Sequence, residues 1–172
     1  MRDAALLGAR LLLGSYMGIH ASQKLFGLFH GPGLDGIGQV FEKNGLTPGR
    51  EMAMAAAATE IAGGVLTVTG FADPAGPLAV AGAMSVAAAH NREGGLMAAR
   101  NGVELPVTYA TLALTLAATG PGKYKIGPAL PGRLAALAAL AGGVAAGALI
   151  AKMVTSKPAP PELVTDPAIA DA

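Results

Sequence analysis

Cysteine and tryptophan are absent from this chain of 172 residues, and aromatic residues make up only 4% of it. Without cysteine the chain offers no disulfide, no CxxC redox relay and no thiolate metal site. Charge is also scarce, because 13% of the residues are charged, whereas soluble domains average about 25%. The net charge of +1 implies no polyanionic partner, which argues against a nucleic-acid-binding protein.

Apolar residues dominate what is present. They make up 52% of the chain, and the mean hydropathy is +0.50. A soluble domain of this size cannot bury so much apolar surface, because much of its area must face water. We therefore predict an integral membrane protein that has the lipid bilayer as a partner. The 25 glycines agree with this, because small residues let membrane helices approach closely.

Five stretches with few charges approach the length of about 20 mostly apolar residues that a membrane helix needs. They are residues 4–25, 52–72, 74–91, 105–122 and 134–151. This pattern predicts an all-α membrane protein with five spans. A fold with four spans and a peripheral last segment is the alternative. The Pro- and Ala-rich tail, residues 156–172, is expected to be disordered.

The connection at residues 27–51 is long and contains a short amphipathic piece at residues 36–43. It lies on the side that carries more Lys and Arg, with seven such residues against four. The seven are Lys24, Lys43, Arg50, Arg92, Arg100, Lys152 and Lys157, and the four are Arg2, Lys123, Lys125 and Arg133. Because cytoplasmic loops are enriched in Lys and Arg, we expect this connection and the C-terminus to lie in the cytoplasm.

Two charges lie well inside the apolar stretches, whereas Lys24 stands at the end of the first. Arg10 lies in the first and Glu60 in the second. Ionisable groups inside a membrane are costly, so each is a functional candidate. A long Arg side chain covers much of the depth between them, which predicts an intramembrane Arg10–Glu60 charge pair. The alternative is a proton or ligand site near the middle of the membrane.

A second polar group is expected where the spans end beside the long connection. His20, Gln23 and Lys24 share one helix face because they are spaced i, i+3 and i+4. His90 ends the third span and Glu104 begins the fourth. These five residues form a candidate polar pocket, or they are interfacial side chains that reach into the lipid head groups. Two histidines alone do not specify haem or a metal, and no metal site is predicted.

Five motifs in order resemble those of the DoxX family. The segment HASQKLFG at residues 20–27 is similar to the family's HGxQKLFG, with Ala21 in place of Gly. The others are FEKNGLTPG at 41–49, EIAGG at 60–64, His90 with Gly94, Gly95 and Glu104, and TGPGKY at 119–124. Gly127 stands where an Asp is common, so an acidic role at that position is in doubt.

The resemblance implies a fold and a setting. It implies an integral membrane four-helix bundle of the DoxX type over residues 1–130, in the bacterial inner membrane. Residues 131–155 then form an added fifth C-terminal hydrophobic helix. Relatives include subunits of thiosulfate:quinone oxidoreductase and members of oxidative-stress or thiol-redox membrane assemblies, and many members have no assigned reaction.

Two functions are open at this point. The first is a redox-associated subunit that binds quinone or couples to a soluble redox partner. It need not be an enzyme, because the chain has neither cysteine nor a Gly-rich dinucleotide motif to carry electrons alone. The second is a non-catalytic membrane scaffold or a small-solute transporter. The GxxxG segments at residues 14–18 and 143–147 predict helix contacts within the chain, or a homo-oligomer.

Overall fold

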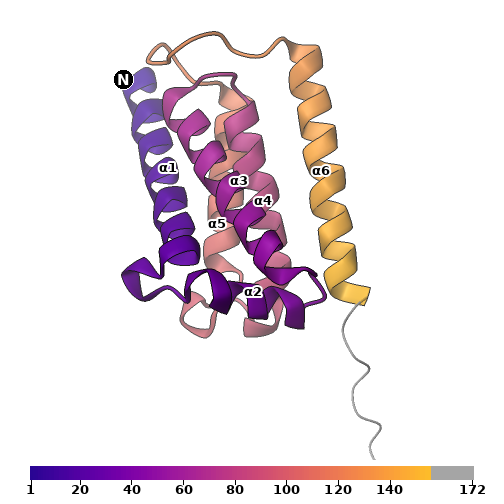
Figure 1. Ribbon diagram of the computed structural model, residues 1–172. Helices are drawn as coiled ribbons and strands as arrows, with labels where there is room; N and C mark the ends of the chain where they lie inside the picture. The colour runs from indigo at the N-terminus through magenta and orange to yellow at the C-terminus, as the bar shows by residue number, and fades with distance from the viewer. Residues whose placement is uncertain (156–172) are drawn as a thin grey trace, which may run out of the picture.

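The computed structural model describes residues 1–155, so the expected disordered tail lies outside the described residues. This part of the chain is all-helical and has no strand, as expected (Figure 1). Its α-helices are α1 (Arg2–Phe26), α2 (Gly33–Lys43), α3 (Gly49–Thr69), α4 (Ala75–Asn91), α5 (Glu104–Thr119) and α6 (Gly132–Thr155). Three short 3-10 turns lie in the connections, at Leu28–His30, Arg92–Gly94 and Ala98–Arg100.

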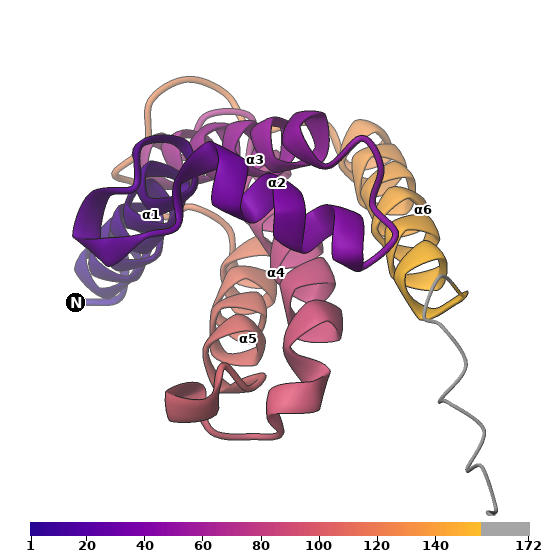
Figure 2. The ribbon, with the colours of Figure 1, turned by 60° about the horizontal axis from the view of Figure 1, so that its bottom comes forward.

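The long helices run side by side. α1 packs mainly against α3, and α4 contacts α3, α5 and α6. Viewed from the end that carries α2, helices α1, α3 and α6 lie in an arc and the α4–α5 pair extends from it (Figure 2). α2 lies across that end of the molecule (Figure 1). The amphipathic piece predicted at residues 36–43 is therefore a full helix, which raises the number of described α-helices to six.

The expected count of four plus one membrane helices is not confirmed. Three helices are both long and apolar enough to cross a membrane, namely α1, α3 and α6. α4 has 17 residues and α5 has 16, which is about 24–26 Å of helix. The bilayer's hydrocarbon core is about 30 Å thick. The run at residues 74–91 exceeds α4 by Pro74 alone, and the run at residues 105–122 extends three residues beyond the end of α5.

Glycine allows two close helix contacts. A Cβ on Gly49 would collide with the carbonyl oxygen of Gly38, so α2 and the start of α3 touch backbone to backbone. A Cβ on Gly14 would lie 3.0 Å from the carbonyl oxygen of Gly64, which brings α1 against α3. Gly14 of the first GxxxG segment thus makes a helix contact within the chain, whereas a Cβ on Gly18 would meet nothing within 4 Å. A Cβ on Gly143 or Gly147 of the second segment meets nothing within 4 Å.

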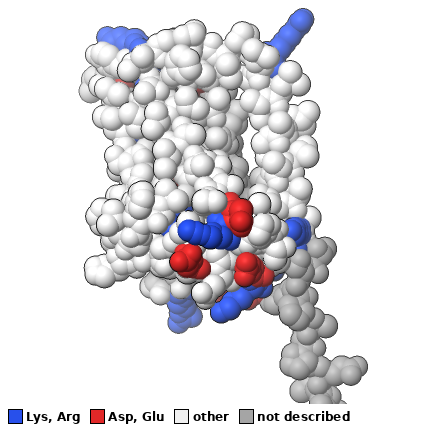
Figure 3. Space-filling view, in the orientation of Figure 1, with Lys and Arg blue, Asp and Glu red and all other residues white. Residues whose placement is uncertain are grey.

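A belt without Lys, Arg, Asp or Glu separates the two charged ends on the face shown in Figure 3. Large apolar side chains are exposed along the helices, including Leu12 (54%), Val65 (56%), Leu114 (53%) and Leu140 (66%). Soluble proteins rarely expose contiguous apolar surfaces of this extent. The apolar helices and this surface indicate a protein that contacts the lipid bilayer.

Candidate functional site

Arg10 is a buried structural cation. Its guanidinium donates to the carbonyls of Thr67 (2.8 Å) and Val68 in the last turn of α3. It also donates to Pro121 and Tyr124, each at 2.7 Å, in the connection after α5. Carbonyls at a helix C-terminus have no partner within the helix and carry partial negative charge, so a guanidinium suits them. Arg10 therefore ties α1 to α3 and to the α5–α6 connection.

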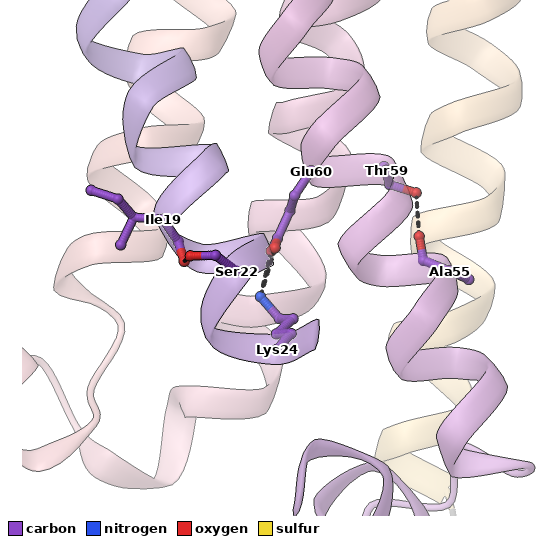
Figure 4. Close-up of polar contacts among 6 residues, drawn as sticks. All are labelled: Ile19, Ser22, Lys24, Ala55, Thr59 and Glu60. Carbon is purple, nitrogen blue, oxygen red and sulfur yellow. Dashed lines mark hydrogen bonds and ion pairs between the residues drawn. The ribbon is translucent and has the colours of Figure 1, made fainter. Parts of the chain in front are cut away.

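Glu60 pairs with Lys24 instead of Arg10. The Lys24 ammonium lies 2.6 Å from Oε1 and 2.8 Å from Oε2 of Glu60 (Figure 4). The predicted Arg10–Glu60 pair is wrong. Thr67, which Arg10 contacts, lies seven residues beyond Glu60, a rise of about 10 Å toward the N-terminal end of α1. Lys24, at the other end of α1, reaches Glu60 along the bundle.

This ion pair is well shielded from water. The side chain of Glu60 is 4% exposed and that of Lys24 is 19% exposed. Two nearby hydroxyls donate to carbonyls of their own helices. Thr59 donates to the carbonyl of Ala55 (2.8 Å) and Ser22 donates to that of Ile19 (2.7 Å) (Figure 4). Neither hydroxyl competes for the Glu60 carboxylate, which leaves Lys24 as its hydrogen-bonding partner. The pair joins α1 to α3 at the edge of a cavity.

A cavity of about 1140 Å³ brings most of the candidate pocket residues together. His20, Gln23 and Lys24 of α1 and His90 of α4 all line it, together with Glu60. Glu104 does not line it. Its carboxylate instead accepts the backbone N–H of Ala98 at 2.9 Å and holds the α4–α5 connection. Arg10 lies outside the cavity as well.

Tyr109 of α5 completes the polar part of the cavity. Its ring lies edge-on to that of His20 with centroids 5.7 Å apart, and 5.1 Å from the ring of Tyr16. Sequence reasoning missed Tyr109, although it is the only ring-bearing polar residue of the fourth apolar stretch. His90 adds an open hydrogen-bonding position, since its Nδ1 is buried and has no partner among the described residues.

The rest of the cavity is apolar, and glycines leave free space along its wall. Gly82 of α4 and Gly142, Gly143 and Gly147 of α6 line it, and a Cβ on any of them would meet nothing within 4 Å. Ile37 and Phe41 of α2 also line it. The cavity therefore combines donors and acceptors from α1, α3, α4 and α5 with an apolar stretch between α4 and α6. Such a space fits a molecule with a polar head and an apolar body.

Across residues 1–155, no three His, Asp or Glu side chains gather as they would around a metal ion. His20 and His90 line the same cavity, but only Glu60 adds a carboxylate, and it is held by Lys24. The site's chemistry is hydrogen bonding and charge within an apolar setting.

One family model matches the chain. It describes DoxX and covers residues 5–91, half of the chain, from α1 to the end of α4. Arg10, His20, Lys24, Glu60 and His90 all lie inside the matched region, whereas Tyr109 and α6 lie outside it. No curated protein and no solved structure matches the chain significantly.

Proposed function

The chain belongs to the DoxX family of membrane proteins, and on that premise we propose that it is a redox-associated subunit that binds a quinone. The observation that carries the proposal is the cavity that joins the polar group around Lys24 and Glu60 to the apolar space between α4 and α6. A quinone has two carbonyl acceptors on a flat ring and a hydrocarbon tail. It needs one or two donors within an apolar cleft.

The polar end supplies suitable donors. His20 and Tyr109 lie together, with ring centroids 5.7 Å apart, and each can donate to a carbonyl oxygen. His90 contributes a buried nitrogen without a partner among residues 1–155. Glu60 holds Lys24 in place through two short contacts, and the third N–H of the ammonium is a further donor for a carbonyl oxygen.

The chain itself brings no electron carrier. It contains neither cysteine nor a Gly-rich dinucleotide motif. Electrons for a bound quinone would therefore come from a partner, which supports a subunit in place of an independent enzyme. A soluble redox protein on the side of α2 is our expected partner, because the polar end of the cavity lies under that helix.

We propose a multi-pass arrangement in the bacterial inner membrane. α1, α3 and α6 have the length and hydropathy of membrane spans. The shorter α4 and α5 lie alongside them in both views (Figures 1 and 2), and the exposed residues of α5 include Leu105, Val107 and Leu114. Five long helices that lie side by side, with α4 packed against α3, α5 and α6, support five crossings.

Quinone titration of the purified protein in detergent tests the function. We expect His20→Ala and His90→Ala each to weaken binding about fivefold to tenfold, the effect of one lost hydrogen bond in an apolar site. His30→Ala is the matched control, because this third histidine is exposed and does not line the cavity. Thermal unfolding midpoints show that each variant folds.

A wild-type protein without measurable quinone affinity would overturn the redox reading. The alternative is then a membrane scaffold or a small-solute transporter. Equal losses in the His30→Ala control would instead show that the effect does not come from the cavity.

A further inference from the structure

A second hollow lies at the opposite end of the molecule from α2. Its volume is about 420 Å³, and it is formed by α1, the end of α3 and the connection after α5. Its apolar side is made by Leu7, Leu11, Val68 and Ile126, and its cations are Arg10, Lys123 and Lys125. None of these residues belongs to the candidate quinone cavity.

Charge at this end is unbalanced. Among the described residues this end carries five cations, Arg2, Arg10, Lys123, Lys125 and Arg133, against two carboxylates, Asp3 and Asp73. The α2 end carries six of each, namely Lys24, Lys43, Arg50, Arg92, Arg100 and Lys152 against Asp35, Glu42, Glu51, Glu60, Glu93 and Glu104. The hollow therefore faces an excess of positive charge, and an anion would balance it.

The nearby carboxylates form no ion pair with the two lysines in the described part of the chain. Asp3 accepts the backbone N–H of Lys123 at 3.1 Å. Asp73 is 7% exposed. Burial raises its pKa, although the charges of Arg10 and Lys125 act in the opposite direction. The Lys125 ammonium donates to the carbonyl of Gly127 (3.0 Å).

The lysines stand on a fixed stretch of backbone. Arg10 binds the carbonyls of Pro121 and Tyr124 on either side of Lys123. The N–H of Ile126 donates to the carbonyl of Thr69 at 2.9 Å, which fastens the chain just after Lys125. The basic side chains are thus presented from a preformed connection, which limits the entropy lost when a ligand binds.

We propose that this hollow binds the head group of an anionic phospholipid. The phosphate would lie between Lys123 and Lys125, and the acyl chains would follow Leu7, Leu11 and Val68 along α1 and α3. Leu11 is 46% exposed and Ile126 is 69% exposed, so apolar surface continues from the cations onto two helices of membrane-spanning length. Basic residues beside apolar helices attract anionic lipids by this combination of charge and apolar contact.

Binding of fluorescent phosphatidylglycerol to the full chain in detergent tests the proposal, with phosphatidylcholine as the neutral comparison. We expect wild type to prefer phosphatidylglycerol. Lys123→Gln with Lys125→Gln should weaken its binding about twentyfold or more, since each lysine contributes about fivefold. Replacing both lysines by Arg should keep the affinity, because the charge is retained. Phosphatidylcholine binding should not change.

The matched control removes two cations from the other end. Lys43→Gln with Arg100→Gln makes the same change in net charge and should leave binding unaltered. Equal binding of the two lipids, an unaffected lysine variant or an equal loss in the control would each overturn the proposal. Full displacement by millimolar inorganic phosphate would overturn it too, because the ligand would then be a soluble anion and no lipid.

Discussion

The residue that most departs from its expected role is Arg10, which is 2% exposed. It makes no ion pair within the described part of the chain. Four of its five N–H groups bind backbone carbonyls instead. A sequence does not show which backbone carbonyls accept a hydrogen bond from a side chain, because every residue has a carbonyl. Glu60 was therefore predicted as the partner of Arg10, because it is the one carboxylate within the neighbouring apolar stretch. The actual partners are backbone carbonyls at the end of α3 and in the connection after α5.

The Lys24–Glu60 pair gives the first stability prediction. Removing one partner leaves the other charge buried, which costs about 3 kcal/mol, near the lower end for buried pairs because Lys24 keeps some exposure. We expect Glu60→Gln and Lys24→Met each to lower the unfolding free energy by about this amount. The double variant should lose less than the sum of the two. Chemical unfolding in detergent measures all three.

An exposed ion pair of the same chain serves as the control for these three variants. Arg50 and Asp35 lie 3.5 Å apart, but their side chains are 55% and 85% exposed. Water screens such a pair, so Asp35→Asn and Arg50→Gln should change stability little. Strict additivity of the Lys24 and Glu60 variants would contradict the pair's energetic role.

At the scale of elements, the positions of the helices could be predicted but their lateral order could not. Uncharged runs located α1, α3, α4, α5 and α6, because an apolar helix has to be long and uninterrupted to cross lipid. The residues of α3 and α4 are mostly apolar on every face of the helix. Periodicity therefore does not reveal which face meets which neighbour. The placement of α6 beside α4 follows from contacts far apart in the chain.

The candidate site was predictable to a similar extent. Helical spacing placed His20, Gln23 and Lys24 on one face, and chain direction brought His90 to the same level. Glu104 shared that level but faces the α4–α5 connection, where it accepts the N–H of Ala98. Depth can be read from a sequence, whereas rotation about a helix axis requires knowledge of the packing. Tyr109 was missed for the same reason.

The wall formed by α6 gives a prediction about ligand binding. Gly143→Leu should project into open space in the cavity, because its Cβ meets nothing within 4 Å. We expect quinone affinity to fall about tenfold, since overpacking of an occupied apolar space costs about 1–3 kcal/mol. The unfolding midpoint without ligand should not decrease.

A neighbouring position on the same helix controls for that change. Ala141 is exposed and does not line the cavity, so Ala141→Leu adds a similar volume outside the cavity. It should bind quinone like wild type. Unchanged affinity in Gly143→Leu would show that the ligand does not use the space between α4 and α6.

At the scale of the whole molecule, the two ends carry different chemistry. The α2 end combines the candidate quinone site with balanced charge, and the other end combines Arg10 with an excess of cations. An apolar belt separates them on the face shown in Figure 3. A redox partner and a lipid head group would thus meet opposite sides of one protein. Which end faces the cytoplasm then decides where each interaction takes place.

The distribution of Lys and Arg predicts that the α2 end is cytoplasmic. In the structure the last turns of α6 lie at this same end, because Lys152 of α6 donates to the carbonyl of Thr47 at 3.4 Å, beside the start of α3. Because the chain has no cysteine, single cysteines can report topology without background. Asn44→Cys should resist a membrane-impermeant maleimide in sealed cells and react after lysis, whereas Lys123→Cys should react in both. The opposite pattern would reverse the orientation and place the basic hollow on the cytoplasmic side.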